Sequence, residues 1–252
     1  MKKLKQPLLF SLAILPFAAI GAFFTCLYQF DLYSPEIMEQ AIAQTGSREV
    51  LVAVSVLQVL IYTFVCSFLG YLLADKTKLW KPIRIRKDTL LQVLLTSVLL
   101  GGLFSLDYWT FGRALPQITG SYAAGLTLSG ILAAVFYGGV IEEVLLRLFF
   151  LTLIAFLIWK LCFRKRTKEA IPTGVFIAAN IVAALFFAAG HIPATITAFG
   201  TLTPLILFRC FLLNGGLGLV FGFFYRRHGI HYAMLSHAVV HIVSKVIWLV
   251  LI

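Results

Sequence analysis

The chain has 252 residues, of which 61% are hydrophobic and 12% charged, and its mean hydropathy is +0.97. This composition leaves too little polar surface for a soluble globular domain. The formal net charge of +11 would suit a nucleic-acid partner, but 16 of the 21 Lys and Arg residues fall in four short patches between apolar runs. Such patches are typical of membrane topology signals and headgroup contacts, so we expect membrane lipid as a partner and no nucleic acid.

Seven apolar runs follow one another along the chain. Runs of about 18 or more apolar residues can cross a bilayer as helices, and their continuous hydrophobicity differs from the alternating pattern of a barrel. The predicted spans are 8–28, 50–73, 89–106, 122–159, 172–191, 203–225 and 229–251. We therefore predict an all-α fold, a polytopic transmembrane helical bundle of about seven spans that forms one membrane-embedded domain over residues 1–252.

The connections between the spans predict the orientation of the chain. The four basic patches lie at the N-terminus and after the second, fourth and sixth spans, whereas the alternate connections carry few positive charges. The positive-inside rule then places the N-terminus in the cytoplasm and the C-terminus outside. The first span has no clear small-residue cleavage site, so we expect it to remain uncleaved. Residues 34–45, "SPEIMEQAIAQT", begin with a helix-start signal and predict a short interfacial helix.

The fourth span is longer than a bilayer requires. About 38 residues would form a helix of roughly 57 Å, nearly twice the thickness of the hydrocarbon core. Gly138 and Gly139 weaken the helix just before two glutamates, so we predict a single crossing with a bend or a half-buried extension. A broken fourth span, with eight helices in all, is the alternative.

The same span carries charges in the segment "EEVLLR". Glu143 and Arg147 are spaced i,i+4 with the acid first, so they share a helix face and can pair. Glu142 points about 100° away around the helix and remains free for another partner. Charges at membrane depth are costly and usually functional, although a buried ion network that only fixes packing is the alternative.

Three histidines lie on the later spans. His237 and His241, in "LSHAVVH", are spaced i,i+4 and aim at one point, while His191 ends the fifth span in "FAAGH", one turn after Phe187. Packing between helices, or an interfacial cap for His191, would also explain single histidines. A shared site requires the fifth helix to end inside the protein, so that "HIPATITAFG" lines a cavity and His191 lies within about 10 Å of Glu142.

Two further cations, Arg209 and Lys245, lie near predicted span ends. Long basic side chains at such positions commonly extend along the helix to reach the polar interface. We therefore expect both side chains to reach the membrane surface and assign them no role in the site.

Three short motifs follow one another: "EEVLLR" at 142–147, "FAAGH" at 187–191 and "HAVVH" at 237–241. In this order they resemble the CAAX protease and bacteriocin-processing family of intramembrane endopeptidases, also called the CPBP or Abi family, which includes the type II CAAX prenyl endopeptidases. The similarity covers roughly residues 122–245. We therefore expect a catalytic core over 122–252 and variable N-terminal spans over 1–121.

The resemblance implies a hydrolase, an endopeptidase that cleaves a membrane-associated peptide or protein by glutamate-activated water. Glu142 would be the base, and His191 would orient the water and handle protons. The oxyanion would be stabilised by His237 and His241. The implied supporting residues are Glu143, Arg147 and Phe187.

The resemblance implies no cofactor, but the chain departs from the family at one position. His241 stands where the family commonly has Asn, and neutral imidazole still supplies one hydrogen-bond donor. His241 could also form a zinc site together with three other side chains, so zinc remains an open alternative. The zinc ligands would be Glu142, His191, His237 and His241.

The resemblance also suggests a class of substrate and a location in the cell. The substrate would be a prenylated protein or a secreted peptide precursor, and the protein would reside in a bacterial cell membrane. One alternative is a non-catalytic bacteriocin-immunity or scaffolding protein. Another is a proton-coupled transporter with Glu142 and the histidines as a relay, but it predicts inverted repeats, which the sequence lacks.

Overall fold

The computed structural model describes residues 2–251, and its regular elements in this range are helices. Seven of its helical segments are long and apolar enough to cross a membrane. They are α1 (Lys2–Leu32), α3 (Arg48–Thr77), α4 (Lys87–Ser105), α7 to α8 (Leu128–Cys162), α9 with α10 (Thr173–Gly190 and Ile192–Phe199), α11 to α12 (Pro204–His228) and α13 (Ile230–Leu251). The predicted all-α, seven-span bundle is confirmed.

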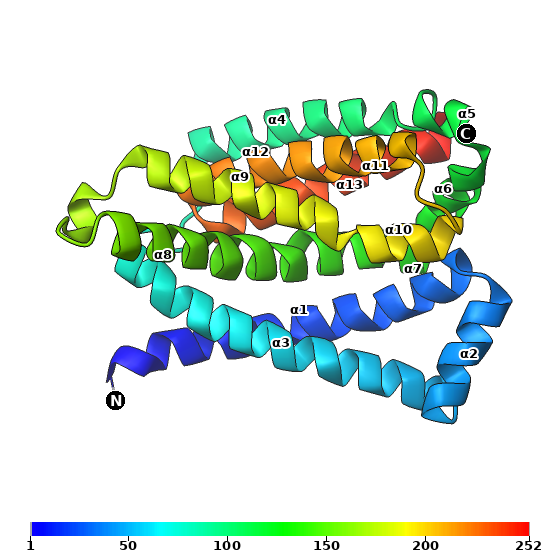
Figure 1. Ribbon diagram of the computed structural model, residues 1–252, viewed down its shortest axis with the longest axis horizontal. Coiled ribbons are helices and arrows are strands. Elements are labelled where there is room, and N and C mark those ends of the chain that lie inside the picture. The colour runs from blue at the N-terminus through cyan, green and yellow to red at the C-terminus, as the bar shows by residue number, and fades with distance from the viewer. Residues whose placement is uncertain (1, 252) are drawn as a thin grey trace.

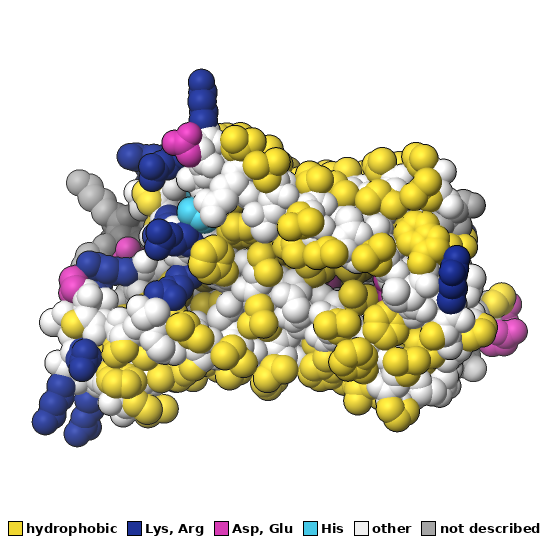
Figure 2. All heavy atoms as spheres, turned by 90° about the horizontal axis from the view of Figure 1, so that it is seen from above, with side chains coloured by type: hydrophobic (Ala, Val, Ile, Leu, Met, Phe, Trp, Pro, Cys, Tyr) yellow, Lys and Arg dark blue, Asp and Glu magenta, His cyan; other side chains and the backbone are white. Residues whose placement is uncertain are grey.

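The surface of the bundle is that of an integral membrane protein. Large apolar side chains face outward along the spans, and Leu57, Leu95 and Phe186 are each more than half exposed. Hydrophobic side chains cover the middle of the molecule, and Lys and Arg gather at one end (Figure 2). The two chain ends lie at opposite ends of the bundle, as an odd number of crossings requires (Figure 1). Exposed apolar surface on this scale is stable where lipid covers it.

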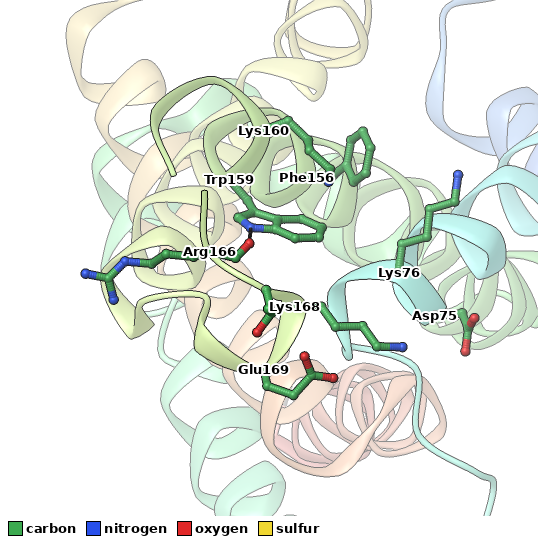
Figure 3. Close-up of a pocket in the computed structure, with 9 residues that line it drawn as sticks. Asp75, Lys76, Phe156, Trp159, Lys160, Arg166, Lys168 and Glu169 are labelled. Carbon is green, nitrogen blue, oxygen red and sulfur yellow. Dashed lines mark hydrogen bonds between the residues drawn. The ribbon is translucent and has the colours of Figure 1, made fainter. Parts of the chain in front are cut away.

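The basic end contains a shallow pocket between the C-terminal ends of α3 and α8. Lys76, Lys160, Arg166 and Lys168 surround Trp159 there (Figure 3). The Nζ atom of Lys160 lies 3.8 Å from the centre of a Trp159 ring. Basic and aromatic side chains at a membrane interface are typical of contact with lipid headgroups.

The helices α1 and α3 lie side by side along one flank and are joined by α2 (Pro35–Thr45). This short helix lies across the ends of the two spans (Figure 1). It begins after Ser34 with Pro35 in its first turn and ends at Gly46, whose φ of 90° favours glycine. The predicted short helix at 34–45 is therefore present.

The fourth span is the central helix of the bundle. It consists of α7 (Leu128–Leu132), η2 (Ala133–Glu142), η3 (Val144–Leu151) and α8 (Thr152–Cys162), and it packs against α1, α3, α9, α12 and α13. The helix is continuous from Leu128 to Cys162, so the span does not break at Gly138 and Gly139. The predicted range 122–159 is instead interrupted at Thr127, whose extended backbone separates α6 (Thr119–Leu126) from α7.

The two glycines of this span have a packing role that the sequence did not reveal. A Cβ atom on Gly139 would lie 3.0 Å from the Cβ of Ala238, and one on Gly138 would lie 3.4 Å from Nε2 of His237. The glycines therefore let α13 approach closely. The backbone does depart from α-helical geometry here, since η2 and η3 are π-helical, a conformation that is rare and frequent at functional sites.

Candidate functional site

A cavity of about 550 Å³ lies inside the bundle between α1, η2, α9, α10, η5 (Phe211–Gly215) and α13. All four residues that the sequence analysis assigned to catalysis line it. The cavity extends to Tyr28 and Tyr33 at the end of α1 and to Phe199 at the end of α10. It therefore extends toward the end of the bundle that lies opposite the basic pocket.

Glu142, at the end of η2, lies between two histidines. Its Oε1 atom is 3.8 Å from Nε2 of His191, and its Oε2 atom is 3.9 Å from Nε2 of His237. These distances are too long for direct hydrogen bonds but suit a bridging water. The separation is well within the limit of about 10 Å expected for a shared site.

His191 is held in one tautomer by the end of α9. Its Nδ1 lies 2.8 Å from the carbonyl oxygen of Phe187, and because a carbonyl only accepts, Nδ1 carries the proton. The backbone N–H of His191 bonds instead to Ala188, which leaves the Phe187 carbonyl available. In the neutral ring, Nε2 therefore presents a lone pair toward Glu142.

The segment after His191 lines the cavity, as the sequence predicted, through Ala194, Thr195 and Ala198. It is helical as α10, with Pro193 in its first turn, where the missing N–H is tolerated. The fifth helix α9 ends at Gly190, which is exposed but lines the cavity beside the site.

Glu143 lies away from the cavity and is fully buried. It forms the ion pair expected from its spacing with Arg147, at 2.9 Å between Oε1 and Nη1. The same Oε1 lies 2.8 Å from Nδ1 of His237. Since the carboxylate accepts, Nδ1 of His237 is the donor, and neutral His237 has an unprotonated Nε2.

Aromatic rings fix the orientation of these polar groups. The guanidinium of Arg147 lies 4.4 Å from the ring centre of Phe187, and its Nη2 donates to the carbonyl of Gly218 at 3.2 Å. The ring of Phe221 stacks on His237 with a centre separation of 4.4 Å. Phe221 could not be predicted as part of the site, because nothing in the apolar run "GLVFGFF" separates it from ordinary core residues.

His241 lies beside His237, with 3.2 Å between the two Nε2 atoms. One of these atoms must donate, and Nε2 of neutral His237 is the acceptor. His241 therefore carries its proton on Nε2 and donates it to His237. The pair presents one N–H group at the cavity wall.

The zinc alternative has a direct geometric test. Over residues 2–251, no group of three or more His, Cys, Asp or Glu side chains is arranged so that it could hold a metal ion. The four side chains of the zinc set instead form the contacts described above. Zinc therefore stays an alternative that metal analysis and chelation test.

Arg209 does not reach the membrane surface, and that expectation is wrong. Its Nε donates to Oδ1 of Asp107 at 2.8 Å, and the hydroxyl of Tyr122 donates to Oδ2 of the same carboxylate at 3.0 Å. Burial and the Asp107 carboxylate both raise the pKa of Tyr122, which therefore remains a donor. This pairing leaves no local pattern in the sequence, because Asp107 and Arg209 are far apart along the chain.

The fold and the site together define a polytopic helical membrane protein with a glutamate–histidine centre in an internal cavity. Residues 124–243 match the sequence model of the type II CAAX prenyl endopeptidase Rce1-like family. The matched range contains the whole glutamate–histidine centre. No curated protein and no solved structure matched the chain significantly.

Proposed function

We propose that this protein is an intramembrane endopeptidase that hydrolyses a peptide bond of a membrane-associated peptide or protein. One observation carries the proposal: the Glu142 carboxylate lies 3.8 and 3.9 Å from two imidazole nitrogens within a cavity. The family match supports the protease class. The substrate, a prenylated protein or a secreted peptide precursor, and the bacterial membrane belong to the proposal as well.

In this mechanism a water molecule bridges Glu142 and His191. Both Oε1 and the unprotonated Nε2 accept hydrogen bonds, so the water oxygen directs a lone pair at the substrate carbonyl. As the new C–O bond forms, one proton moves to Glu142. The tetrahedral intermediate then collapses, the C–N bond breaks, and the proton passes from Glu142 to the leaving amine.

The two histidines of α13 stabilise the oxyanion. The N–H of His241 turns from His237 to the developing negative charge. His237 is a second donor when solvent supplies a proton to its Nε2 before the water attacks; this proton stays on His237 throughout the reaction, and Glu143 stabilises the imidazolium through Nδ1. The buried Arg147 keeps Glu143 ionised and in place.

The proposal is tested with Glu142→Gln and His191→Ala. Membrane peptides and proteins from cells with the wild type and with each variant are compared by mass spectrometry, and accumulating uncleaved species are then tested with purified protein. General-base catalysis contributes roughly 10²- to 10⁴-fold, so cleavage by Glu142→Gln should fall by about that factor. Glu39→Gln, on the exposed face of α2, is the matched control. Undiminished cleavage by Glu142→Gln would exclude Glu142 as the base, whereas the absence of any cleaved species with the wild type would favour the non-catalytic alternative.

Metal content is measured on the same purified protein. We expect less than stoichiometric zinc and unchanged cleavage after chelation. Zinc at one equivalent per chain, together with loss of cleavage on chelation and its return with zinc, would replace glutamate-activated water with the zinc alternative.

A further inference from the structure

Lys245 is a buried cation that the proposed peptidase step does not use. It is only 8% exposed and lines the same cavity as Glu142. Its Nζ donates to the carbonyl oxygen of Gly125 at 2.6 Å. The expectation that Lys245 reaches the membrane surface is therefore wrong, because its side chain turns inward to the end of α6 (Thr119–Leu126).

Lys245 also lacks a counter-charge. Two other cations beside the cavity have acidic partners, Glu143 for Arg147 and Asp107 for Arg209. Over residues 2–251, no Asp or Glu lies within 4.0 Å of the Lys245 ammonium. A buried, unpaired charge at membrane depth is costly, and an ammonium has three donors, of which Gly125 takes one.

The walls beside Lys245 are aromatic. Trp248 packs against Tyr122 and Phe104, with ring centres 5.1 and 5.9 Å away, and all three rings line the cavity. Apolar walls strengthen the attraction between an ammonium and an anion because they exclude water. This part of the cavity suits one singly charged anionic group at the end of an apolar segment.

Lys245 lies in line with the oxyanion donors on α13. His237, His241 and Lys245 follow at intervals of four residues, which places each about 6 Å further along the helix axis. An extended peptide covers about 3.3–3.6 Å per residue. A peptide whose cleaved carbonyl lies at the two histidines would therefore reach the ammonium roughly two to four residues further on.

We propose that Lys245 binds a carboxylate of the substrate, two to four residues from the cleaved bond, and so selects where the peptide is cut. This inference rests on the proposed endopeptidase function. The carboxylate can come from the C-terminus of the substrate or from an Asp or Glu side chain. A single negative charge matches the single unpaired ammonium.

Binding tests the proposal separately from cleavage. A fluorescent peptide with a farnesylated cysteine and three further residues is made as the free acid, as the carboxamide, and as a carboxamide with Glu in the last position. Affinities are measured for full-length Glu142→Gln protein in nanodiscs. Charge-assisted hydrogen bonds are among the strong ones, so we expect the acid to bind about tenfold or more tightly than the carboxamide. Tight binding of the Glu peptide would show that Lys245 also accepts a carboxylate from a side chain.

Substitutions of Lys245 then test whether this residue binds the carboxylate. Adding Lys245→Met should reduce binding of the acid to the level of the carboxamide and leave the carboxamide unchanged, whereas Lys245→Arg should keep most of the preference. Lys160→Met at the basic end is the matched control and should change neither peptide. Melting temperatures no lower than that of the parent protein, together with unchanged carboxamide affinity, show that the variants fold.

Three results would overturn the proposal. The acid and the carboxamide could bind equally, or the acid could fail to bind. The third is that Lys245→Met weakens the binding of both peptides equally. Failure of the endopeptidase function gives a different result. The acid would then bind selectively through Lys245, but neither wild-type protein nor any variant would cleave it.

Discussion

At the scale of single residues, two adjacent glutamates differ because of what surrounds them. The Glu142 side chain is 18% exposed and faces the cavity, whereas that of Glu143 is 0% exposed and contacts Arg147 and His237. A carboxylate that faces a cavity can exchange protons with water, while one held between two buried donors fixes their orientation. In the proposed mechanism, Glu142 therefore supplies the chemistry and Glu143 supports the site.

This division predicts that two isosteric substitutions affect different properties, one the stability of the protein and the other cleavage. Glu143→Gln should destabilise the protein by about 3–5 kcal/mol, because it leaves the Arg147 charge buried without its partner. Glu142→Gln should change stability by less than about 1 kcal/mol, since the side chain has no close charged partner, and should chiefly remove cleavage. Thermal unfolding in detergent measures the first effect. Equal stability of the two variants would contradict this division.

A second prediction concerns the glycine beside Arg147. A Cβ on Gly218 would lie 3.1 Å from Nη2 of Arg147 and 3.2 Å from the Phe187 ring, whereas one on Gly216 would have nothing within 4 Å. Gly218→Ala should therefore cost about 1–3 kcal/mol and lower cleavage, because it displaces the guanidinium. Gly216→Ala, in the same helix, should be neutral or stabilising by up to about 1 kcal/mol. Equal melting temperatures for the two variants would contradict the proposed close fit.

At the scale of elements, small residues set how closely the helices approach. Lipid tails are as apolar as the helix surfaces, so packing rather than hydrophobic burial joins helices within a membrane. The contact of α4 with α13 shows this, since Gly101 lies against Val243 and Val240 of α13. Because α13 carries His237, His241 and Lys245, its position on α4 bears on the geometry of the candidate site.

The α4–α13 contact can be tested with neighbouring glycines. A Cβ on Gly101 would lie 2.7 Å from the Cβ of Val243, whereas one on Gly102 would have nothing within 4 Å. Gly101→Ala should cost about 1–3 kcal/mol through overpacking and lower the rate of cleavage. Gly102→Ala should preserve both stability and rate. The measurements are melting temperature and turnover, and equal behaviour of the two variants would count against a close helix contact.

At the scale of the whole molecule, the basic side chains gather at one end of the bundle and the cavity with Glu142 extends toward the other. The basic pocket lies at one end, and the cavity extends toward the other, at the end of α1. By the positive-inside rule we propose that the basic end faces the cytoplasm. The cavity would then extend from mid-membrane toward the outer surface.

Cysteine labelling tests this orientation. Cys162 is exposed at the basic end of α8, and Gln44 is exposed on α2 at the other end. With the remaining cysteines replaced, a membrane-impermeant maleimide should label Gln44→Cys in intact cells. Cys162 should react only after the membrane is opened. The reverse pattern would invert the topology.

The sequence determined the seven helices, the short helix α2 and the Glu143–Arg147 pair. These are local properties: bilayer thickness sets the length of an apolar run, and helix geometry sets which residues share a face. The order of three motifs also led to the family and to the residues of the candidate site.

Only the tertiary structure decided which distant groups meet. Glu143 contacts His237 across 94 residues and Arg209 contacts Asp107 across 102. Neither contact leaves a local pattern, and the same is true of Phe221 against His237 and of Lys245 against Gly125. The glycines of the fourth span predicted a bend, while the structure uses them for close approach to α13. The physical reason is that hydropathy and spacing specify each helix alone, whereas contacts between helices depend on how complementary surfaces pack in three dimensions.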